Sequence, residues 1–114
     1  MSMPVSRENA EHYIWGSVCD GWHLLRNSEL SIIEERMPPG AQEQRHFHGR
    51  SRQFFYVLSG ELTMEVAGVH HLLTAGHGLE ISPGELHQAL NQTEGEVRFL
   101  VISQPPSHKD RQSV

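Results

Sequence analysis

The chain has one cysteine, no long apolar run and few positive charges. Cys19 alone cannot form an intramolecular disulfide, and no charged stretch at the N-terminus leads into an apolar run of signal-peptide length, so we expect an intracellular, cytoplasmic protein. No segment approaches the roughly 20 apolar residues that span a bilayer, which predicts a soluble chain without a membrane partner. The nine Lys and Arg are scattered and the formal net charge is −5, which argues against nucleic-acid binding.

The length of 114 residues suits one domain with a real core and is too short for two. Short apolar stretches separated by turn signals are typical of an all-β sandwich or barrel. The predicted strands cover residues 19–25, 30–37, 44–48, 53–58, 61–66, 69–73, 78–81, 88–90 and 97–103. The apolar run 54–58 is expected to form a central strand, because exposure would promote aggregation.

The chain divides into three segments on this basis. Residues 1–20 form an N-terminal segment, either an edge strand or a dimer arm, with a short helix as an alternative within residues 1–14. Residues 21–103 form the barrel, and residues 104–114 form a polar C-terminal tail that begins at prolines unable to continue a ladder. The apolar stretch around Tyr13, Ile14 and Trp15 can cover a sheet edge across a two-fold axis, so a homodimer is expected.

The triplet His46-Phe47-His48 is the most informative feature of the chain. Residues two apart on a strand point to the same face, so both imidazoles can reach one metal ion. Because the chain has nine histidines, chance alone would supply about 0.7 such triplets. The triplet therefore gains its meaning from the residues placed in order around it.

Two ordered sets of residues include or follow the triplet. The first set is Gly40, His46, His48, Gln53 and Gly60, separated by five, one, four and six residues. The second set is Gly76, Ser82-Pro83-Gly84, His87 and Asn91, separated by five, two and three residues. Together they resemble the two motifs of the cupin superfamily, GX5HXHX3-4EX6G and GX5PXGX2HX3N, over residues 40–91. Gln53 stands in place of the usual glutamate, and Ser82 in place of the usual proline.

This resemblance implies a small single-domain cupin, whose fold is a double-stranded β-helix, also called a jelly-roll β-barrel. It implies a metal site made by His46, His48, Gln53 and His87. Three imidazoles suit a divalent transition metal, namely Zn, Fe, Ni, Mn, Co or Cu, and make an all-oxygen Mg or Ca site improbable. An amide at residue 53 would leave the ion its full charge and make it a stronger Lewis acid. Alternatively Gln53 is not a metal ligand, and the three histidines alone bind the ion and leave its other coordination positions open.

Three functional classes stay open for a metal-binding small cupin with a small molecule in its cavity. The first is a metal-dependent enzyme, isomerase-like or lyase-like, that acts on a small carbonyl, enol or sugar-derived compound. The second is a dioxygenase with iron on three histidines, and the third is a non-catalytic binding or sensing module. The ligand set is similar to that of cupins that linearise unsaturated uronates. Those enzymes have an Asp and an Arg where this chain has Val101 and Ser107, so no catalytic residue is transferred.

Strand parity also suggests which other side chains face the cavity. Phe55 and Val57 share the inward parity of Gln53 and are expected to line the cavity or fill the core. Glu80 and Arg98 are the charged residues best placed to reach the cavity, although such charges usually lie on the surface.

Overall fold

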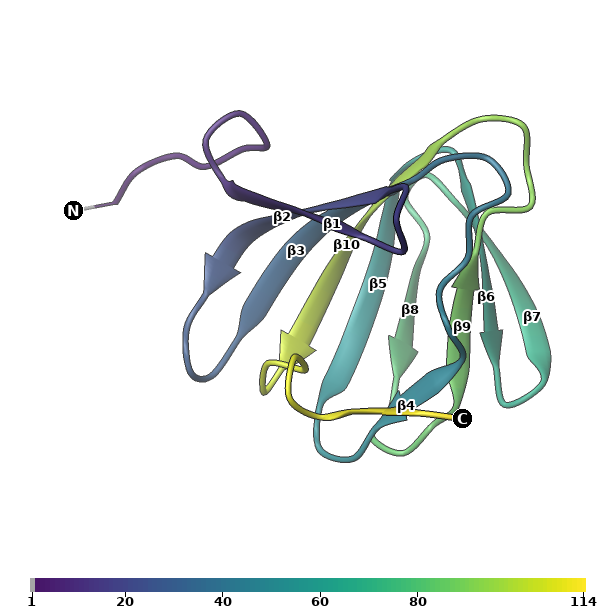
Figure 1. Ribbon diagram of the computed structural model, residues 1–114. Coiled ribbons are helices and arrows are strands. Elements are labelled where there is room, and N and C mark those ends of the chain that lie inside the picture. The colour runs from purple at the N-terminus through teal and green to yellow at the C-terminus, as the bar shows by residue number, and fades with distance from the viewer. Residues whose placement is uncertain (1) are drawn as a thin grey trace.

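The computed structural model describes residues 2–114, which form two antiparallel sheets that face each other and contain no helix (Figure 1). The six-stranded sheet contains, in spatial order, β1 (Glu11–Trp15), β2 (Cys19–Arg26), β3 (Ser31–Met37), β10 (Val97–Gln104), β5 (Arg52–Ser59) and β8 (Gly78–Ile81). The five-stranded sheet contains β11 (Arg111–Ser113), β4 (His46–His48), β9 (His87–Leu90), β6 (Glu61–Val66) and β7 (Val69–Thr74). No helix that could cross a membrane occurs among these described residues.

The predicted all-β jelly roll is confirmed, and the predicted strands match those observed closely. Strands β6 and β8 have the predicted bounds; six of the other predicted strands differ by one or two residues at one end, and β5 is one residue longer at each end. Strand β5 lies between β10 and β8, so the apolar run 54–58 is central as expected. Along β10 the buried side chains of Val97, Phe99 and Val101 alternate with partly exposed ones, the two-residue period of a sheet with one face on the core.

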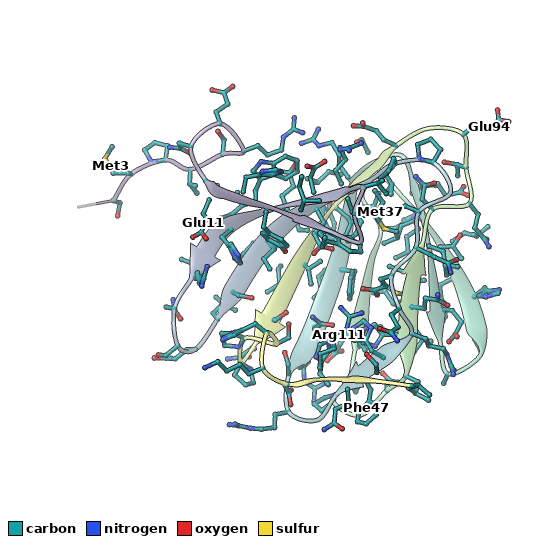
Figure 2. The ribbon with its side chains drawn as sticks, in the orientation of Figure 1. Met3, Glu11, Met37, Phe47, Glu94 and Arg111 are labelled. Carbon is teal, nitrogen blue, oxygen red and sulfur yellow. The ribbon has the colours of Figure 1, made fainter. Side chains whose placement is uncertain are left out.

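The hydrophobic core lies between the two sheets. Its largest fully buried apolar side chains are Phe99, Met37, Leu62, Met64 and Ile81. Figure 2 shows the core residue Met37 toward one end of the barrel, with Phe47 and Arg111 toward the other. Buried polar side chains are also present, and they include His46, His48, Gln53 and His87.

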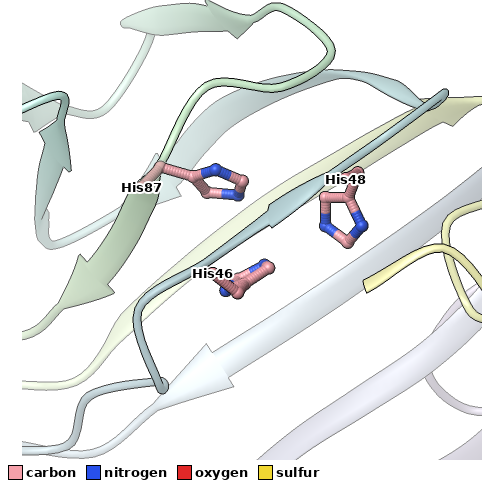
Figure 3. A group of neighbouring side chains, drawn as sticks. All are labelled: His46, His48 and His87. Carbon is pink, nitrogen blue, oxygen red and sulfur yellow. The ribbon is translucent and has the colours of Figure 1, made fainter. Parts of the chain in front are cut away.

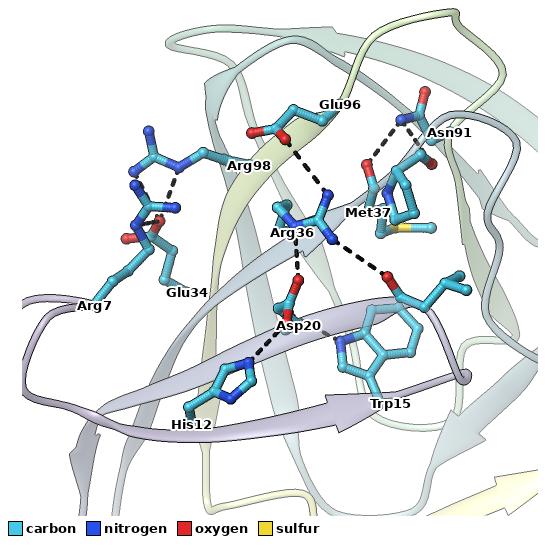
Figure 4. A network of polar contacts seen from close by, with 12 residues as sticks. Arg7, His12, Trp15, Asp20, Glu34, Arg36, Met37, Asn91, Glu96 and Arg98 are labelled. Carbon is cyan, nitrogen blue, oxygen red and sulfur yellow. Dashed lines mark hydrogen bonds and ion pairs between the residues drawn. The ribbon is translucent and has the colours of Figure 1, made fainter.

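The N-terminal segment folds back as the edge strand β1, which pairs with β2. Ion pairs on the outer face tie it to the sheet (Figure 4). The Asp20 carboxylate accepts hydrogen bonds from His12 Nε2 and Arg36 Nε, both at 2.7 Å. Glu34 pairs with Arg98 at 2.8 Å on the same face. Residues 11–15 thus form a strand rather than a helix, and the homodimer stays a prediction.

The C-terminal tail is ordered and ends beside the histidine triplet. Strand β11 pairs antiparallel with β4, with Arg111 opposite His48 and Ser113 opposite His46. The Asp110 carboxylate accepts hydrogen bonds from the backbone N–H groups of Arg50 and Ser51, both at 2.8 Å. The tail therefore forms one edge of the five-stranded sheet.

Candidate metal centre

Three buried histidines meet between the sheets. His46 and His48 come from β4 and His87 from β9, and His46 and His87 are direct register partners. Their possible ligand nitrogens all lie within 4.8 Å of one another. Figure 3 shows the three rings gathered around a common space. The spacing of two residues on β4 produces this arrangement, because it turns both rings to the inner face.

Backbone carbonyl groups orient two of the rings. His46 Nδ1 donates to the Gln44 carbonyl oxygen at 2.7 Å, and His87 Nδ1 donates to the Glu85 carbonyl oxygen at 2.9 Å. A proton on Nδ1 leaves the Nε2 lone pair free. His87 Nε2 and His48 Nδ1 are buried without a hydrogen-bond partner. The cluster thus presents nitrogen atoms that the described protein leaves unsatisfied.

The electrostatic environment keeps these imidazoles neutral. Burial is the main cause that lowers the pKa of His46 to about 3 and that of His48 to about 4. Burial also lowers the pKa of His87, and the charge of Arg111 adds to the lowering at all three rings. Neutral imidazole is the form that binds a metal, so the site needs no deprotonation step at neutral pH.

Gln53 lines the same cavity as His46 and His48, and its side-chain oxygen is unpartnered. Its Nε2 donates to Ser103 Oγ at 3.0 Å and to Ser107 Oγ at 3.4 Å, which fixes the amide orientation. Its Oε1 is buried without a hydrogen-bond partner, although a buried amide oxygen normally accepts a hydrogen bond. Three neutral imidazoles and one unpartnered amide oxygen fit a divalent transition metal.

A cavity of about 350 Å³ opens beside the histidines. That volume is within the range of small-molecule sites. Two sheets and the tail supply its walls, which consist of Tyr13, Trp15, His23, Ile33, Glu35, Glu43, His46, His48, Gln53, Phe55, Val101, Ser107, His108 and Arg111. Nine of these fourteen side chains are polar or ionisable and five are aromatic or aliphatic, which suits a polar small molecule.

The cupin domain model matches residues 33–103, which include both motifs and all three histidines. The chain belongs to the cupin family. This cupin is 30% identical over 87 residues to an oxidoreductase of Arthrobotrys oligospora. The alignment covers 73% of this chain and 34% of the oxidoreductase. The chain spans about a third of the length of the three similar oxidoreductases.

Two further comparisons concern proteins closer to this cupin in size. It is 32% identical over 76 residues to the β-alanine degradation protein BauB of Pseudomonas aeruginosa, covering 65% of this chain and 80% of that one. The polyketide cyclase RemF of Streptomyces resistomycificus superposes with a TM-score of 0.86 at 20% identity, over all of this chain and 86% of that one. The superposition on RemF supports the assignment of the cupin fold.

The expectations for other cavity residues had mixed outcomes. Phe55 lines the cavity of this cupin, and Val57 is fully buried in the core. Glu80 and Arg98, the charged residues best placed to reach the cavity, lie on the outer surface, as is usual for such charges. Glu80 pairs with Arg52 at 2.6 Å on the surface, where both side chains are more than half exposed. Arg98 pairs with Glu34 on the outer face, because its parity on β10 is opposite to that of buried Phe99.

Several cavity residues were not identified from sequence, among them the functional groups of Tyr13, Glu35, Glu43 and Arg111. Only Glu35 had a local signal, because it alternates with Ile33 and Met37 along one strand and so shares their inward face. Tyr13 Oη donates to Glu35 Oε2 at 3.3 Å, which places strand β1 against this carboxyl group. Glu43 Oε1 accepts from the Ala89 backbone N–H at 3.0 Å.

The two cavity carboxyl groups of the cupin hold their protons unusually strongly. Burial, followed by the nearby charge of Glu43, raises the pKa of Glu35 to about 8. Burial also raises the pKa of Glu43 to about 7. A carboxyl group with a pKa near the working pH can both accept and return a proton. Each carboxyl group accepts one hydrogen bond, Glu35 from the Tyr13 hydroxyl group and Glu43 from the Ala89 backbone N–H.

The metal-free cupin should become less stable as pH rises from about 6.5 to 8. Glu35 is protonated in the folded chain up to about 8 but ionises near 4.5 when unfolded, so its stability contribution is full below 4.5 and lost as pH approaches 8. The loss is at most about 1.4 kcal/mol per pH unit. The buried histidines oppose this decline at the start of the range, but their effect fades by about pH 7.5, and Glu43, whose pKa is raised to about 7, adds to the decline. Urea unfolding in the presence of a chelator measures the free energy of unfolding at each pH, which should decline less steeply in Glu35→Gln. The surface variant Glu80→Gln is the control and should decline as the wild type does. An unchanged decline in Glu35→Gln would contradict the assignment.

Proposed function

We propose that this cupin is a metal-dependent enzyme that transfers a proton at the carbon next to a carbonyl group in a small carbonyl, enol or sugar-derived compound. One observation carries the proposal: the Glu35 carboxyl group faces the same cavity as the buried histidines His46 and His48. A small cavity thus combines a candidate metal site with a candidate acid and base.

The metal would be held by His46, His48 and His87, with Gln53 Oε1 as a fourth ligand. The close approach of the ring nitrogens and the unpartnered amide oxygen support this ligand set. A divalent ion bound there would supply a Lewis acid that polarises a carbonyl oxygen and makes the neighbouring C–H bond more acidic.

Glu35 would receive that proton and return it. Its ionised carboxylate takes the proton from carbon, and the resulting neutral acid donates a proton to carbon or oxygen of the product, so no other reactant is needed. Tyr13, hydrogen-bonded to Glu35, holds the carboxyl group in place. The apolar walls formed by Ile33, Phe55 and Val101 limit the access of water to the reacting carbon.

Deuterium incorporation tests this function directly. The metal-loaded chain is incubated in D2O with dihydroxyacetone or pyruvate, and exchange at the carbon next to the carbonyl is followed by proton NMR. We expect accelerated exchange that falls by about 100-fold or more in Glu35→Gln and is retained in the surface variant Glu80→Gln. Saturable binding without exchange would favour the non-catalytic module, and unchanged exchange in Glu35→Gln would remove Glu35 from the mechanism.

The variant Gln53→Glu should bind the metal more tightly. It replaces a neutral amide oxygen with a negatively charged one at the point where Oε1 is buried without a partner. We expect the metal dissociation constant to fall by about tenfold or more, measured by competition with a chromogenic chelator. The variant Gln92→Glu adds the same charge on an exposed loop and should have no effect. An unchanged constant in Gln53→Glu would place Gln53 outside the coordination sphere.

A second candidate function is oxidation with molecular oxygen by iron on His46, His48 and His87. It is favoured by the sequence similarity to proteins described as oxidoreductases. Iron in the purified chain, together with oxygen consumption in the presence of a β-dicarbonyl compound, would support it. Turnover of the same compounds at an equal rate without oxygen would exclude it.

A further inference from the structure

Arg111 is the one lysine or arginine among the described residues that line the cavity. Its Nη2 donates to the Gln44 carbonyl oxygen at 3.2 Å, the same atom that accepts from His46 Nδ1 at 2.7 Å. The guanidinium group and the His46 ring therefore lie no more than two hydrogen-bond lengths apart. A permanent positive charge thus stands at the edge of the histidine cluster.

This guanidinium group has unused hydrogen-bonding capacity. Six other arginines form ion pairs with carboxylates: Arg7, Arg26, Arg36, Arg45, Arg52 and Arg98. Within residues 2–114, Arg111 has no such pair and makes one side-chain hydrogen bond, although guanidinium carries five N–H donors. The cavity carboxyl groups do not fill this role, because Glu35 accepts from Tyr13 and Glu43 from the Ala89 backbone.

We propose that Arg111 binds the carboxylate of the substrate and that the substrate class is a small 2-oxo carboxylate, an inference that rests on the proposed function. A guanidinium group binds a carboxylate with two parallel hydrogen bonds. Because the Arg111 guanidinium group lies close to the His46 ring, a carbonyl oxygen on the carbon next to the bound carboxylate is well placed to face the histidines. A 2-oxo acid has this arrangement.

The position of Glu35 agrees with this orientation. Arg111 belongs to β11 of the five-stranded sheet, whereas Glu35 belongs to β3 of the six-stranded sheet, so a ligand between them meets both. With its carboxylate on Arg111, a 2-oxo acid would direct the remainder of its chain across the cavity toward β3. Ser107 and His108, from the same tail as Arg111, line the cavity and offer further polar contacts.

Binding of two isosteric probes tests the assignment without relying on turnover. Calorimetric titration of the metal-loaded chain with pyruvate and with its neutral analogue pyruvamide should show tighter binding of pyruvate by about tenfold to 100-fold. The variant Arg111→Met should lose this preference, and Arg111→Lys should recover only part of it because lysine keeps the charge but not the fork of donors. Arg50→Met removes a charge outside the cavity, next to the same tail, and should bind both probes as the wild type does.

The outcomes separate this inference from the proposed function. A wild-type chain that binds no transition metal overturns the proposed function and the inference with it. A metal-loaded chain that binds pyruvate and pyruvamide equally, or neither, overturns the Arg111 assignment alone. Full preference for pyruvate in an Arg111→Met variant with normal metal content also overturns it.

Discussion

Replacing His46 with alanine is expected to yield a chain that purifies without a stoichiometric transition metal. His46 is buried, its ring is oriented by the Gln44 carbonyl group, and its nitrogen lies within 4.8 Å of those of His48 and His87. The two remaining imidazoles cannot form the three-nitrogen face, so metal affinity should fall steeply. Loss of a residue that only hydrogen-bonds a metal ligand costs about 10–100-fold, and loss of the ligand itself should cost more. Elemental analysis and chelator competition measure the loss.

The control for this variant is His70→Ala, which removes an exposed histidine on β7. It should keep the metal content and melting temperature of the wild type. Because an ion that binds only the folded chain raises its stability, addition of metal should raise the melting temperature of the wild type and of His70→Ala but not of His46→Ala. Equal metal content in all three proteins would refute the histidine site.

The second large effect is expected from Gly60→Ala, at the end of the first cupin motif. Gly60 has a φ of +82°, and a Cβ placed there would overlap the Glu96 carbonyl oxygen and lie 2.9 Å from Val97 Cα. The positive φ costs a non-glycine residue about 1–2 kcal/mol, and the overlap adds about 1–3 kcal/mol because neighbouring backbone must move. A clear fall in the urea midpoint at constant m-value should follow.

Gly84→Ala separates these two contributions. Gly84 has nearly the same φ, +83°, but a Cβ there would meet nothing within 4 Å. Its loss of stability should therefore report the backbone conformation alone, and the additional loss in Gly60→Ala should report the contact with β10. Equal losses in the two variants would show that the contact with Glu96 and Val97 relaxes without cost.

The fold was predictable because its signals are local. Alternating apolar residues and turn residues mark each strand, and β6 and β8 end where these patterns end. The histidine cluster was predictable for a different reason, since the motif spacings relate β4 to β9 across 38 intervening residues of sequence without any knowledge of the path between them. A family resemblance supplied that long-range information.

The remaining parts of the candidate site depend on contacts that no local pattern encodes. Strand β11 is short and polar, and all three of its residues are exposed, so it has no apolar alternation; its pairing with β4 brings Arg111 to the cavity. Tyr13 reaches Glu35 only because β1 folds back onto β2. Glu35 itself could have been found by parity, but a charged side chain is normally assigned to the solvent face.

The pairing of β11 with β4 has a practical consequence for work with this protein. The last strand is held directly against the strand that carries His46 and His48, and the Val114 N–H group donates to the Arg45 carbonyl group. A polyhistidine tag fused after Val114 would begin beside the candidate metal site and bring competing imidazoles to it. Purification with a removable N-terminal tag avoids this artefact, because the described N-terminus extends away from the barrel (Figure 1).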